Sequence, residues 1–211
     1  MLKGNILTTD GWIHGTVSFE NGRVTALEGH IVDPLANDAP YILPGFIDLH
    51  VHGGGGRDIM EGGDAADTVA RQHAQHGTTS LLATTMTAPR DELMEVVAGL
   101  GEQAKHRASG GARMLGVHLE GPYINPGKLG AQPDAAAVAV RDEVLKYLEL
   151  APIRVVTIAP EISATSARDL ATSPSRFSMR STASASEPTR AIAWEIAWRD
   201  SARSDWLASA V

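Results

Sequence analysis

The sequence predicts an α/β fold in which helices cover a parallel sheet, preceded by a smaller region built from strands alone. Two observations carry this prediction. From Pro44 onward, short apolar runs alternate with longer amphipathic stretches, which is the pattern of strand–helix–strand units. Before Pro44, apolar and polar residues alternate around a hairpin signal. At 211 residues, the chain is long enough for one ample domain or two small ones.

The N-terminal region, residues 1–44, is expected to form antiparallel strands. Residues 16–20 and 23–27 both alternate roughly between apolar and polar side chains. Asn21-Gly22 lies between them, and this dipeptide is the strongest short signal for a tight hairpin. We therefore predict a hairpin there, within a small β domain.

Residues 45–162 are expected to supply about four strand–helix units. Gly77 follows an amphipathic stretch and is a typical helix stop, whereas Pro89 is typical of a helix start. Successive strands that are joined by helices pair in parallel. The predicted strands are 45–52, 78–85, 113–120 and 154–159, and the predicted helices are 64–76, 89–107 and 134–150.

The first of these strands ends in two histidines, His50 and His52, which precede four glycines at 53–56. Alternate side chains of an extended strand share a face, so Asp48, His50 and His52 are expected to point together. Two neutral imidazoles at the end of a buried strand can bind one metal ion, and zinc or iron suits them. The alternative is a chance pair on a half-buried strand, but the glycines favour an open loop over the rings. The opposite face carries Ile47, Leu49 and Val51.

The strand at 113–120 carries the second candidate, Glu120, at its carboxyl end. Aliphatic side chains toward the helices and polar ones inward are what the mouth of a (β/α)8 barrel requires. Glu120 occupies the place on its strand that His52 occupies on the first, so we expect it to bind or bridge a metal. The alternative is a structural carboxylate that caps a loop. The alternation places Gly116, His118 and Glu120 on the inward face, and Leu115, Val117 and Leu119 on the helix face.

The remaining histidines of this region are assigned other roles. His118 shares the inward face one layer deeper than Glu120, where a hydrogen-bonded structural histidine, or one that orients a ligand, is expected. His73, His76 and His106 lie on polar helical stretches and are expected to face solvent. The glycines at 53–56 are not followed by the Gly-Lys-Ser/Thr of a phosphate-binding loop, so they are expected to give the backbone freedom over the barrel mouth.

The composition of the chain excludes some classes of partner and some types of metal ligand. A formal net charge of −7 and an isoelectric point near 5.6 argue against a nucleic-acid backbone or an anionic membrane as partner. The chain has no cysteine, so any metal must be held by nitrogen and oxygen. Residues 1–7 lack the apolar core of a signal peptide, and no uninterrupted apolar run approaches 18 residues. We expect a soluble, cytoplasmic protein that acts on a small molecule.

The composition changes abruptly near residue 163. Residues 163–211 contain 11 of the 14 serines and 3 of the 4 tryptophans, but no histidine and no glycine. Residues 168–185 show no sustained period of either 2 or 3.6. We expect an aberrant or disordered tail, which is either a stretch read in the wrong frame or an ordinary domain boundary. A short helix at 189–198 is compatible with both.

Three segments resemble one family. Pro44-Gly-Phe-Ile-Asp-Leu-His-Val-His52 resembles the first barrel strand of the amidohydrolase superfamily. Gly116-Val-His-Leu-Glu-Gly-Pro-Tyr-Ile-Asn-Pro-Gly-Lys-Leu-Gly-Ala-Gln132 is more specific and is similar to the N-acetylglucosamine-6-phosphate deacetylases. Val155-Val-Thr-Ile-Ala-Pro-Glu161 resembles the next strand of that family. The resemblance covers residues 1–162 and implies that residues 1–44 are part of a small β-sandwich.

The resemblance implies a metal-dependent hydrolase that removes the acetyl group of N-acetylglucosamine 6-phosphate, giving glucosamine 6-phosphate and acetate. Glu120 would be the carboxylate ligand of the principal metal, and His50 and His52 would hold a second metal in binuclear variants. The divalent metal would be zinc or iron, with cobalt or manganese as alternatives. Ala131 and Gln132 match a substrate-contacting pair that often ends in histidine. The family resemblance also suggests a homodimer.

The resemblance further predicts an incomplete site. The family takes two more histidines and a proton-shuttling aspartate from later strands, whereas this chain has no histidine after His118. A complete barrel takes roughly 250 residues, so 45–162 would form only its first half, a partial (β/α)8 barrel without its C-terminal half. We therefore expect a shortened or frameshifted chain of low activity that lacks the catalytic aspartate.

Two other functions remain open at this point. One is a different amidohydrolase, such as a dihydroorotase-like cyclic amidase. Those enzymes usually carry a metal-bridging lysine, and this chain has Glu120 at the corresponding strand end. The other is a half-barrel that binds metal or a sugar phosphate without catalysis.

Overall fold

The computed structural model describes residues 1–159, 161, 177–181 and 194–198. It divides into two compact units, and the boundary falls after Gly45, one residue later than the predicted end of the N-terminal region. The prediction for the tail, 163–211, lies outside the described residues except for two short strands. One of these, Trp194–Trp198, falls in the range that was compatible with a short helix, so these five residues do not form it.

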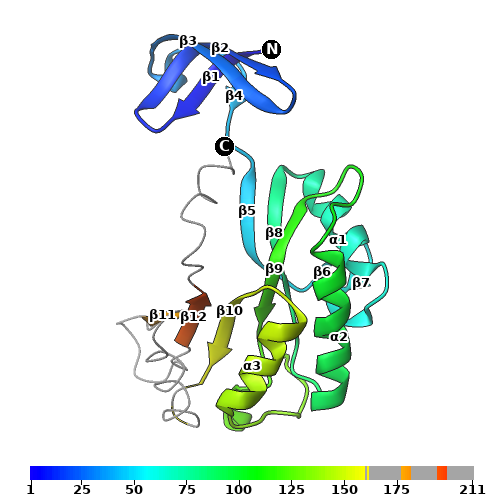
Figure 1. Ribbon diagram of the computed structural model, residues 1–211. Coiled ribbons are helices and arrows are strands. Elements are labelled where there is room, and N and C mark those ends of the chain that lie inside the picture. Colours follow the sequence, from blue (N-terminus) through cyan, green and yellow to red (C-terminus); the bar gives the residue numbers. More distant parts are fainter. Residues whose placement is uncertain (160, 162–176, 182–193, 199–211) are drawn as a thin grey trace. The chain divides into compact units, whose positions relative to one another are not determined.

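The first unit is a four-stranded sheet of β1 (Leu2–Thr8), β2 (Gly11–Glu20), β3 (Arg23–Ile31) and β4 (Tyr41–Ile42). The strands lie in the order β3-β2-β1-β4, and only β4 pairs in parallel (Figure 1). Asn21 and Gly22 link β2 to β3 with φ values of 51° and 74°. A type I′ hairpin requires this left-handed backbone, so the predicted hairpin is confirmed.

A fully buried asparagine, Asn5, connects this sheet to the segment after β3, which contains a short 3-10 helix, η1 (Pro34–Ala36). Its amide nitrogen donates to the Pro34 carbonyl and to Oδ1 of Asn37, at 3.2 and 3.0 Å. Its oxygen accepts from Nδ1 of His14 at 3.1 Å. An unpartnered buried amide would cost about 1–3 kcal/mol, so these bonds fix the path of the segment across the sheet.

The second unit is a six-stranded sheet in which four parallel strands are followed by an antiparallel pair. The parallel strands are β5 (Phe46–Val51), β8 (Thr78–Thr84), β9 (Arg113–Leu119) and β10 (Ile153–Ile158). β12 (Trp194–Trp198) pairs with β10, and β11 (Phe177–Ser181) pairs with β12. The order is β11-β12-β10-β9-β8-β5. The predicted parallel pairing is confirmed, and the curled sheet has the coarse architecture of a partial barrel.

Three helices alternate with these strands, as predicted. They are α1 (Ala65–Ala74), α2 (Arg90–Gln103) and α3 (Arg141–Leu150), and they cover one side of the sheet (Figure 1). Short elements lie between them: β6 (Gly53–Gly54), β7 (Arg57–Asp58), η2 (Ile59–Glu61) and η3 (Pro126–Lys128). Among the described residues, no helix is both long enough and apolar enough to cross a membrane.

The hydrophobic core lies between the sheet and the helices. Each helix contributes a fully buried valine: Val69 from α1, Val97 from α2 and Val144 from α3. Burying such a side chain contributes about 1.5–3 kcal/mol, so this layer is the main source of stability for the unit. The strand side of the core consists of Val51, Leu81, Ala83, Met114, Val117, Leu119, Ile153, Val156 and Ile158.

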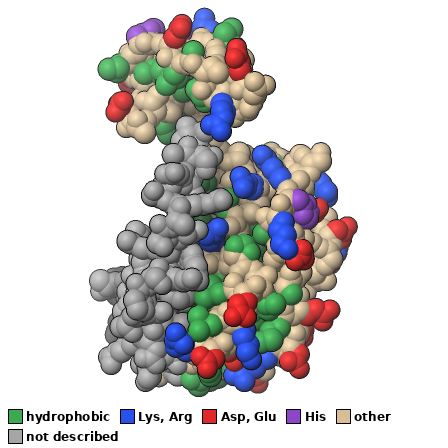
Figure 2. Space-filling view, viewed as in Figure 1, with side chains coloured by type: hydrophobic (Ala, Val, Ile, Leu, Met, Phe, Trp, Pro, Cys, Tyr) green, Lys and Arg blue, Asp and Glu red, His purple; other side chains and the backbone are tan. Residues whose placement is uncertain are grey.

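The outer face of the helices is mixed in charge. Figure 2 shows acidic and basic side chains interspersed over the helix-covered part of the second unit. In α3, for example, basic Arg141 is next to acidic Asp142, and basic Lys146 is three residues before acidic Glu149. The excess of acidic residues is therefore not concentrated in one patch on this face.

α3 begins at Arg141, whereas the sequence predicted a helix over 134–150. The segment before it is bonded to the loop that follows β9. The amide of Ala137 donates to the Pro122 carbonyl at 2.8 Å, and the amide of Ala135 turns back to the Pro133 carbonyl. Backbone groups that are used in this way cannot join the i to i−4 ladder of a helix, although the alanine-rich sequence favours one.

A bulge in β9 interrupts the alternation that the sequence predicted. Leu81 of β8 pairs with Met114 and Leu82 pairs with Gly116, so Leu115 is an extra residue in β9. The alternation reverses at this point. Met114 therefore lies in the core although its parity predicts the inward face, and Leu115, expected to face the helices, is half-buried and outside the core.

The helix-facing side of β5 also departs from prediction. Val51 is buried in the core as expected, but Ile47 and Leu49 are 39% and 54% exposed. β5 is the last strand of the sheet. An end strand has a neighbour on one side only, so less of its surface is covered.

A buried polar cluster connects the loop after β9 to α3. The Tyr123 hydroxyl donates to Oε1 of Glu143 at 3.1 Å, and Nε of Arg90 lies 2.9 Å from Oε2 of the same carboxylate. Tyr147, one helical turn after Glu143, is also fully buried, yet its hydroxyl has no hydrogen-bond partner among the described residues. Burial raises the pKa of Tyr147 to about 12, and the charge of Glu143 adds to the rise.

Replacing Tyr147→Phe is expected to stabilise the chain by about 1 kcal/mol at neutral pH, because it removes a buried hydroxyl without a partner. In the wild type, this hydroxyl titrates near pH 10 when unfolded and near pH 12 when folded. Because the pKa is higher in the folded state, ionisation favours unfolding: the wild type loses no stability from this group below pH 10 and loses it progressively as the pH rises from 10 through 12. Denaturant unfolding at pH 7 and from pH 10 to 12 measures both effects. Equal alkaline losses in the two proteins would contradict the assignment.

Candidate metal centre

The two strand-end histidines come from the carboxyl end of β5. His50 lies in the strand and His52 follows it, after which the chain turns back in the small β6–β7 hairpin. Gly55 and Gly56 make this turn with φ values of 62° and 79°. Glycine adopts this left-handed backbone without strain, so the expected conformational freedom of the glycine run is found at these two positions.

Glu120 follows β9 and opens a loop that requires glycine. Gly121 has a φ of 68°, and a Cβ at this position would lie 2.3 Å from Oγ1 of Thr87. The backbone of Glu120 is held by the Thr85 hydroxyl, which donates to its carbonyl at 3.0 Å and accepts from its amide at 3.2 Å. The carboxylate therefore extends from a fixed point at the end of the strand.

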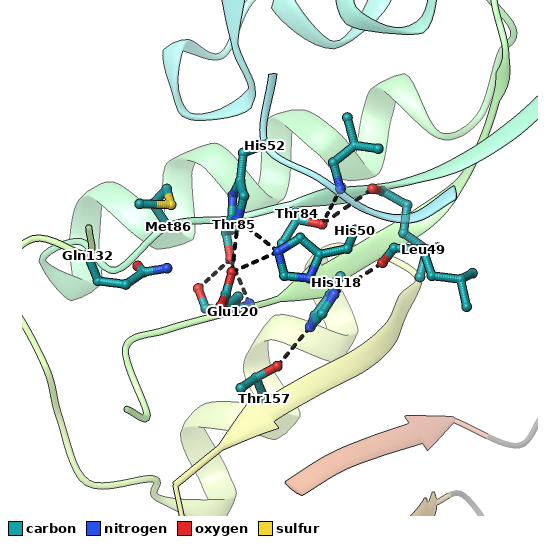
Figure 3. A network of polar contacts seen from close by, with 12 residues as sticks. Leu49, His50, His52, Thr84, Thr85, Met86, His118, Glu120, Gln132 and Thr157 are labelled. Atoms are coloured by element: carbon teal, nitrogen blue, oxygen red, sulfur yellow. Dashed lines mark hydrogen bonds and ion pairs between the residues drawn. The ribbon is translucent and has the colours of Figure 1, made fainter. Parts of the chain in front are cut away.

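The structure brings His50, His52 and Glu120 together at the carboxyl ends of β5 and β9 (Figure 3). Oε2 of Glu120 lies 3.3 Å from Nε2 of His50 and 2.9 Å from Nε2 of His52. The two Nε2 atoms are 2.9 Å apart, and the rings meet edge to face. One ligand atom from each residue thus points at a common centre.

The three side chains fit a divalent metal ion. Zinc binds imidazole nitrogen and carboxylate oxygen at about 2.0–2.2 Å, which places tetrahedral neighbours about 3.3 Å apart. The separations here are 2.9, 2.9 and 3.3 Å. Oε2 of Glu120 is buried, and among the described residues no donor is aligned with it for a hydrogen bond, although two imidazole nitrogens lie beside it. A cation would satisfy all three atoms.

His52 and Glu120 shift each other's pKa values. Contact with Glu120 raises the pKa of His52, and burial opposes this with a smaller effect. Burial alone would raise the pKa of Glu120, but contact with His52 and the charges of His50 and His52 together lower it. Glu120 is therefore ionised at neutral pH, and this is the form that binds a cation.

His118 lies one layer deeper, and both of its ring nitrogens are engaged. Nδ1 lies 3.2 Å from the Leu49 carbonyl oxygen, and Nε2 lies 2.8 Å from Oγ1 of Thr157 (Figure 3). Burial lowers the pKa of His118 to about 4, so the ring is neutral at pH 7. Because neither nitrogen is available to an ion, His118 does not join the group of three.

Of the predicted substrate-contacting pair, Gln132 lies beside this centre and Ala131 is exposed. Oε1 of Gln132 accepts from the amide of Thr87 at 2.7 Å, and its amide nitrogen is directed toward Glu120 (Figure 3). Asp48, which was expected to share the face of the histidines, does not join the ligand group. Its Oδ1 accepts from the backbone amide of His50 at 3.1 Å.

Three histidines on helical stretches were predicted to face solvent, and two of them do. His76 and His106 are exposed, as expected. His73 was expected to face solvent, but it is half-buried, and its Nε2 lies 3.1 Å from the Gly53 carbonyl oxygen. The prediction was wrong because α1 packs against the β6–β7 hairpin, a contact that the helical pattern does not reveal.

Sequence reasoning missed the threonines at the end of β8. Thr84, Thr85 and Thr87 are fully or almost fully buried. The Thr84 hydroxyl accepts from the amide of Val51 at 2.9 Å, while Thr85 holds the backbone of Glu120. A signal was available, since three threonines within four positions follow the apolar residues Leu81, Leu82 and Ala83.

Comparison with known proteins assigns the chain to a family. A model of the amidohydrolase family matches residues 41–182, which include the four parallel strands and the centre at their ends. The match continues beyond residue 162, where the resemblance recognised in the sequence stops. This chain belongs to the amidohydrolase family.

The relatives within that family act on phosphorylated amino sugars, by their names. N-acetylgalactosamine-6-phosphate deacetylase of Escherichia coli O157:H7 is 34% identical over 169 residues, covering 74% of this chain and 42% of the relative. N-acetylglucosamine-6-phosphate deacetylase of Bacillus subtilis (strain 168) is 36% identical over 175 residues, covering 76% of this chain and 44% of the relative. The chain therefore spans less than half the length of these relatives.

Solved structures of the same group share the fold. N-acetylglucosamine-6-phosphate deacetylase of Thermotoga maritima matches with a TM-score of 0.67 and 29% identity, over 82% of this chain and 45% of that one. The Mycobacterium smegmatis enzyme matches with a TM-score of 0.65 and 28% identity, over 80% of this chain and 49% of that one. The likeness thus extends to the arrangement of most of this chain.

Replacing Glu120→Gln is expected to lower the pKa of His52 toward its usual value of 6.5, because contact with the carboxylate is the main cause of its rise. An NMR pH titration of the imidazole protons in the metal-free chain measures the change. Asp67→Asn is the matched control, since it removes a carboxylate that contacts His106 instead. A His52 titration that is the same in both variants would contradict the assigned contact.

Proposed function

We propose that this chain carries the metal-binding part of a hydrolase that removes the acetyl group of N-acetylglucosamine 6-phosphate, giving glucosamine 6-phosphate and acetate. The observation that carries the proposal is the convergence of His50, His52 and Glu120 on one centre at the strand ends. It is supported by relatives named as deacetylases of N-acetyl amino sugar 6-phosphates. Metal-assisted cleavage of a linear amide is the reaction that agrees with the ligand group and with the names of the relatives.

The three side chains would hold a divalent ion through two nitrogens and one oxygen. Bound there, the ion would acidify a water molecule and polarise the acetamide oxygen of the substrate. Imidazole and carboxylate suit zinc or iron best, and cobalt or manganese also fit. Glu120 contributes a full negative charge, which lowers the net charge of the occupied centre.

Gln132 would contact the sugar. Its oxygen is taken by the amide of Thr87, so its NH2 group is left to donate to a sugar hydroxyl or the acetamide oxygen. Ala131 would contribute through its backbone, because its side chain offers no polar atom. The substrate is thus a small amino sugar phosphate, and we propose a cytoplasmic homodimer as the working form.

The chain itself is expected to be a weak catalyst. Among the described residues, no fourth histidine or carboxylate joins the group of three. The sequence has no histidine after His118 that could complete the ligand set. A positioned general acid–base contributes about 10²–10⁴-fold to rate, so a centre without one retains metal binding but little turnover.

The purified chain is expected to bind a divalent metal that chelators remove easily, because three ligands hold it. Metal analysis after dialysis against zinc should show an ion that is lost in the double variant His50→Ala/His52→Ala. The control is His76→Ala/His106→Ala, which removes two exposed histidines and should leave the metal content unchanged. Equal metal content in wild type and the His50/His52 variant would refute the proposed ligands.

Acetate release tests the reaction. We expect the zinc-loaded chain to hydrolyse N-acetylglucosamine 6-phosphate at least about 100-fold more slowly than the Bacillus subtilis relative. Any release should be abolished by the His50→Ala/His52→Ala double substitution. N-acetylgalactosamine 6-phosphate is the second substrate to assay, because one relative is named for it. Turnover within about tenfold of the relative would show that residues beyond the described ones complete the site.

A further inference from the structure

Near its carboxyl end, β5 contains one residue more than its partner strand, β8. Asp48 pairs with Leu81 and Val51 pairs with Ala83, so two residues of β5, Leu49 and His50, stand opposite a single residue of β8. Such a bulge leaves backbone groups outside the ladder and re-aims the side chains beside it. The bulge therefore sets the direction of the His50 side chain and of the strand end that leads to His52.

Side chains replace the hydrogen bonds that the ladder lacks at this bulge. The amide of His50 donates to Oδ1 of Asp48 at 3.1 Å, and the amide of Val51 donates to Oγ1 of Thr84 at 2.9 Å. The carbonyl of Leu49 accepts from Nδ1 of His118 at 3.2 Å. One backbone group in each of three successive residues is thus bonded by a side chain, and the three side chains come from three different strands.

His118 reaches this carbonyl across an intervening strand. β8 lies between β9, which carries His118, and β5, which carries Leu49. Neighbouring strands are about 4.8 Å apart, so the contact requires the curl of the sheet to bring β5 toward β9. On its other side, Nε2 of His118 meets the hydroxyl of Thr157 on β10 at 2.8 Å. One imidazole therefore spans the inner face from β5 to β10.

The tautomer of His118 follows from these partners. A carbonyl oxygen can only accept, so Nδ1 must carry the proton, and the Thr157 hydroxyl must donate to Nε2. The ring also stands edge to face against the ring of His50, with centres 4.9 Å apart and planes at 87° (Figure 3). His118 thus contacts both the backbone before His50 and the His50 ring itself.

We propose that His118 is a positioning residue for metal binding. It holds the β5 bulge through the Leu49 carbonyl and limits the rotation of the His50 ring, so that His50 and His52 meet Glu120 at one centre. Thr84 supports the same bulge through the amide of Val51. The inference rests on the proposed function in one respect, since it takes that centre to bind a divalent ion.

Two substitutions separate the hydrogen bond from the ring. His118→Phe keeps a ring of similar size but removes both nitrogens. His118→Asn retains a donor near the position of Nδ1 and removes the contact with Thr157. Loss of such outer partners typically weakens metal binding 10- to 100-fold, so we expect at least about tenfold weaker Zn²⁺ affinity for the phenylalanine variant. The asparagine variant, which keeps a donor for the Leu49 carbonyl but lacks the ring beside His50, should bind Zn²⁺ more weakly than the wild type and more tightly than the phenylalanine variant.

The readouts are Zn²⁺ affinity by chelator competition and the visible absorption spectrum of the Co²⁺-loaded chain. The spectrum reports ligand geometry, which a loss of stability alone does not change. Val97→Ala is the matched control, because it destabilises the core of α2 without touching the bulge, and its affinity and spectrum should equal those of the wild type. Wild-type affinity and spectrum in His118→Phe would overturn the proposal.

Thr84→Val keeps the test decisive if His118→Phe fails to fold. It removes the acceptor of the Val51 amide and should also weaken Zn²⁺ binding and alter the Co²⁺ spectrum. In the metal-free chain, faster hydrogen exchange of Val51 is expected in this variant, and unchanged exchange would overturn the role of the bulge. If the wild-type chain binds no metal while Thr84→Val still speeds the exchange of Val51, the proposed function is refuted and the bulge assignment stays in place.

Discussion

Parallel pairing of β5, β8 and β9 is the constraint on which the rest of the second unit depends. Parallel strands end at the same edge of a sheet, so residues that are far apart in sequence, such as His52 and Glu120, meet there without any special loop. The same pairing directs one face of each strand to the helices. Burial of Val51, Val117 and Leu119 on that face fixes the strand ends from which the polar side chains extend.

Irregular backbone at that edge is bonded by threonine side chains. Thr84 and Thr85, from the strand between the two that carry the candidate ligands, bond the backbone of β5 on one side and of Glu120 on the other. A buried carbonyl or amide without a partner would cost about 1–3 kcal/mol, so these hydroxyls permit irregular backbone where the side chains need it. Oε2 of Glu120 is buried without an aligned donor among the described residues, so together with the two imidazole nitrogens beside it this oxygen retains acceptor capacity toward a cation.

Local sequence patterns predicted the features that depend on neighbours along the chain. The hairpin at Asn21-Gly22, the strand–helix alternation, and the pairing of His52 with Glu120 at the strand ends follow from periodicity and turn chemistry. Features set by contacts between distant segments were not predictable in this way. The bulge in β9 displaces Met114 into the core, and a bond to Pro122 keeps Ala137 out of α3. In each case a partner remote in sequence overrode a local preference.

The exposure of the two imidazoles bears on how the proposed centre would exchange an ion. The side chain of His50 is 49% exposed and that of His52 is 32% exposed, whereas Glu120 is more covered at 20%. A bound ion would therefore enter and leave along a solvent-facing path without separation of the strands. Its exchange would be limited by the breaking of individual ligand bonds, not by unfolding. The occupant would accordingly be set by the cations supplied around the chain, weighted by their affinity for nitrogen and oxygen ligands.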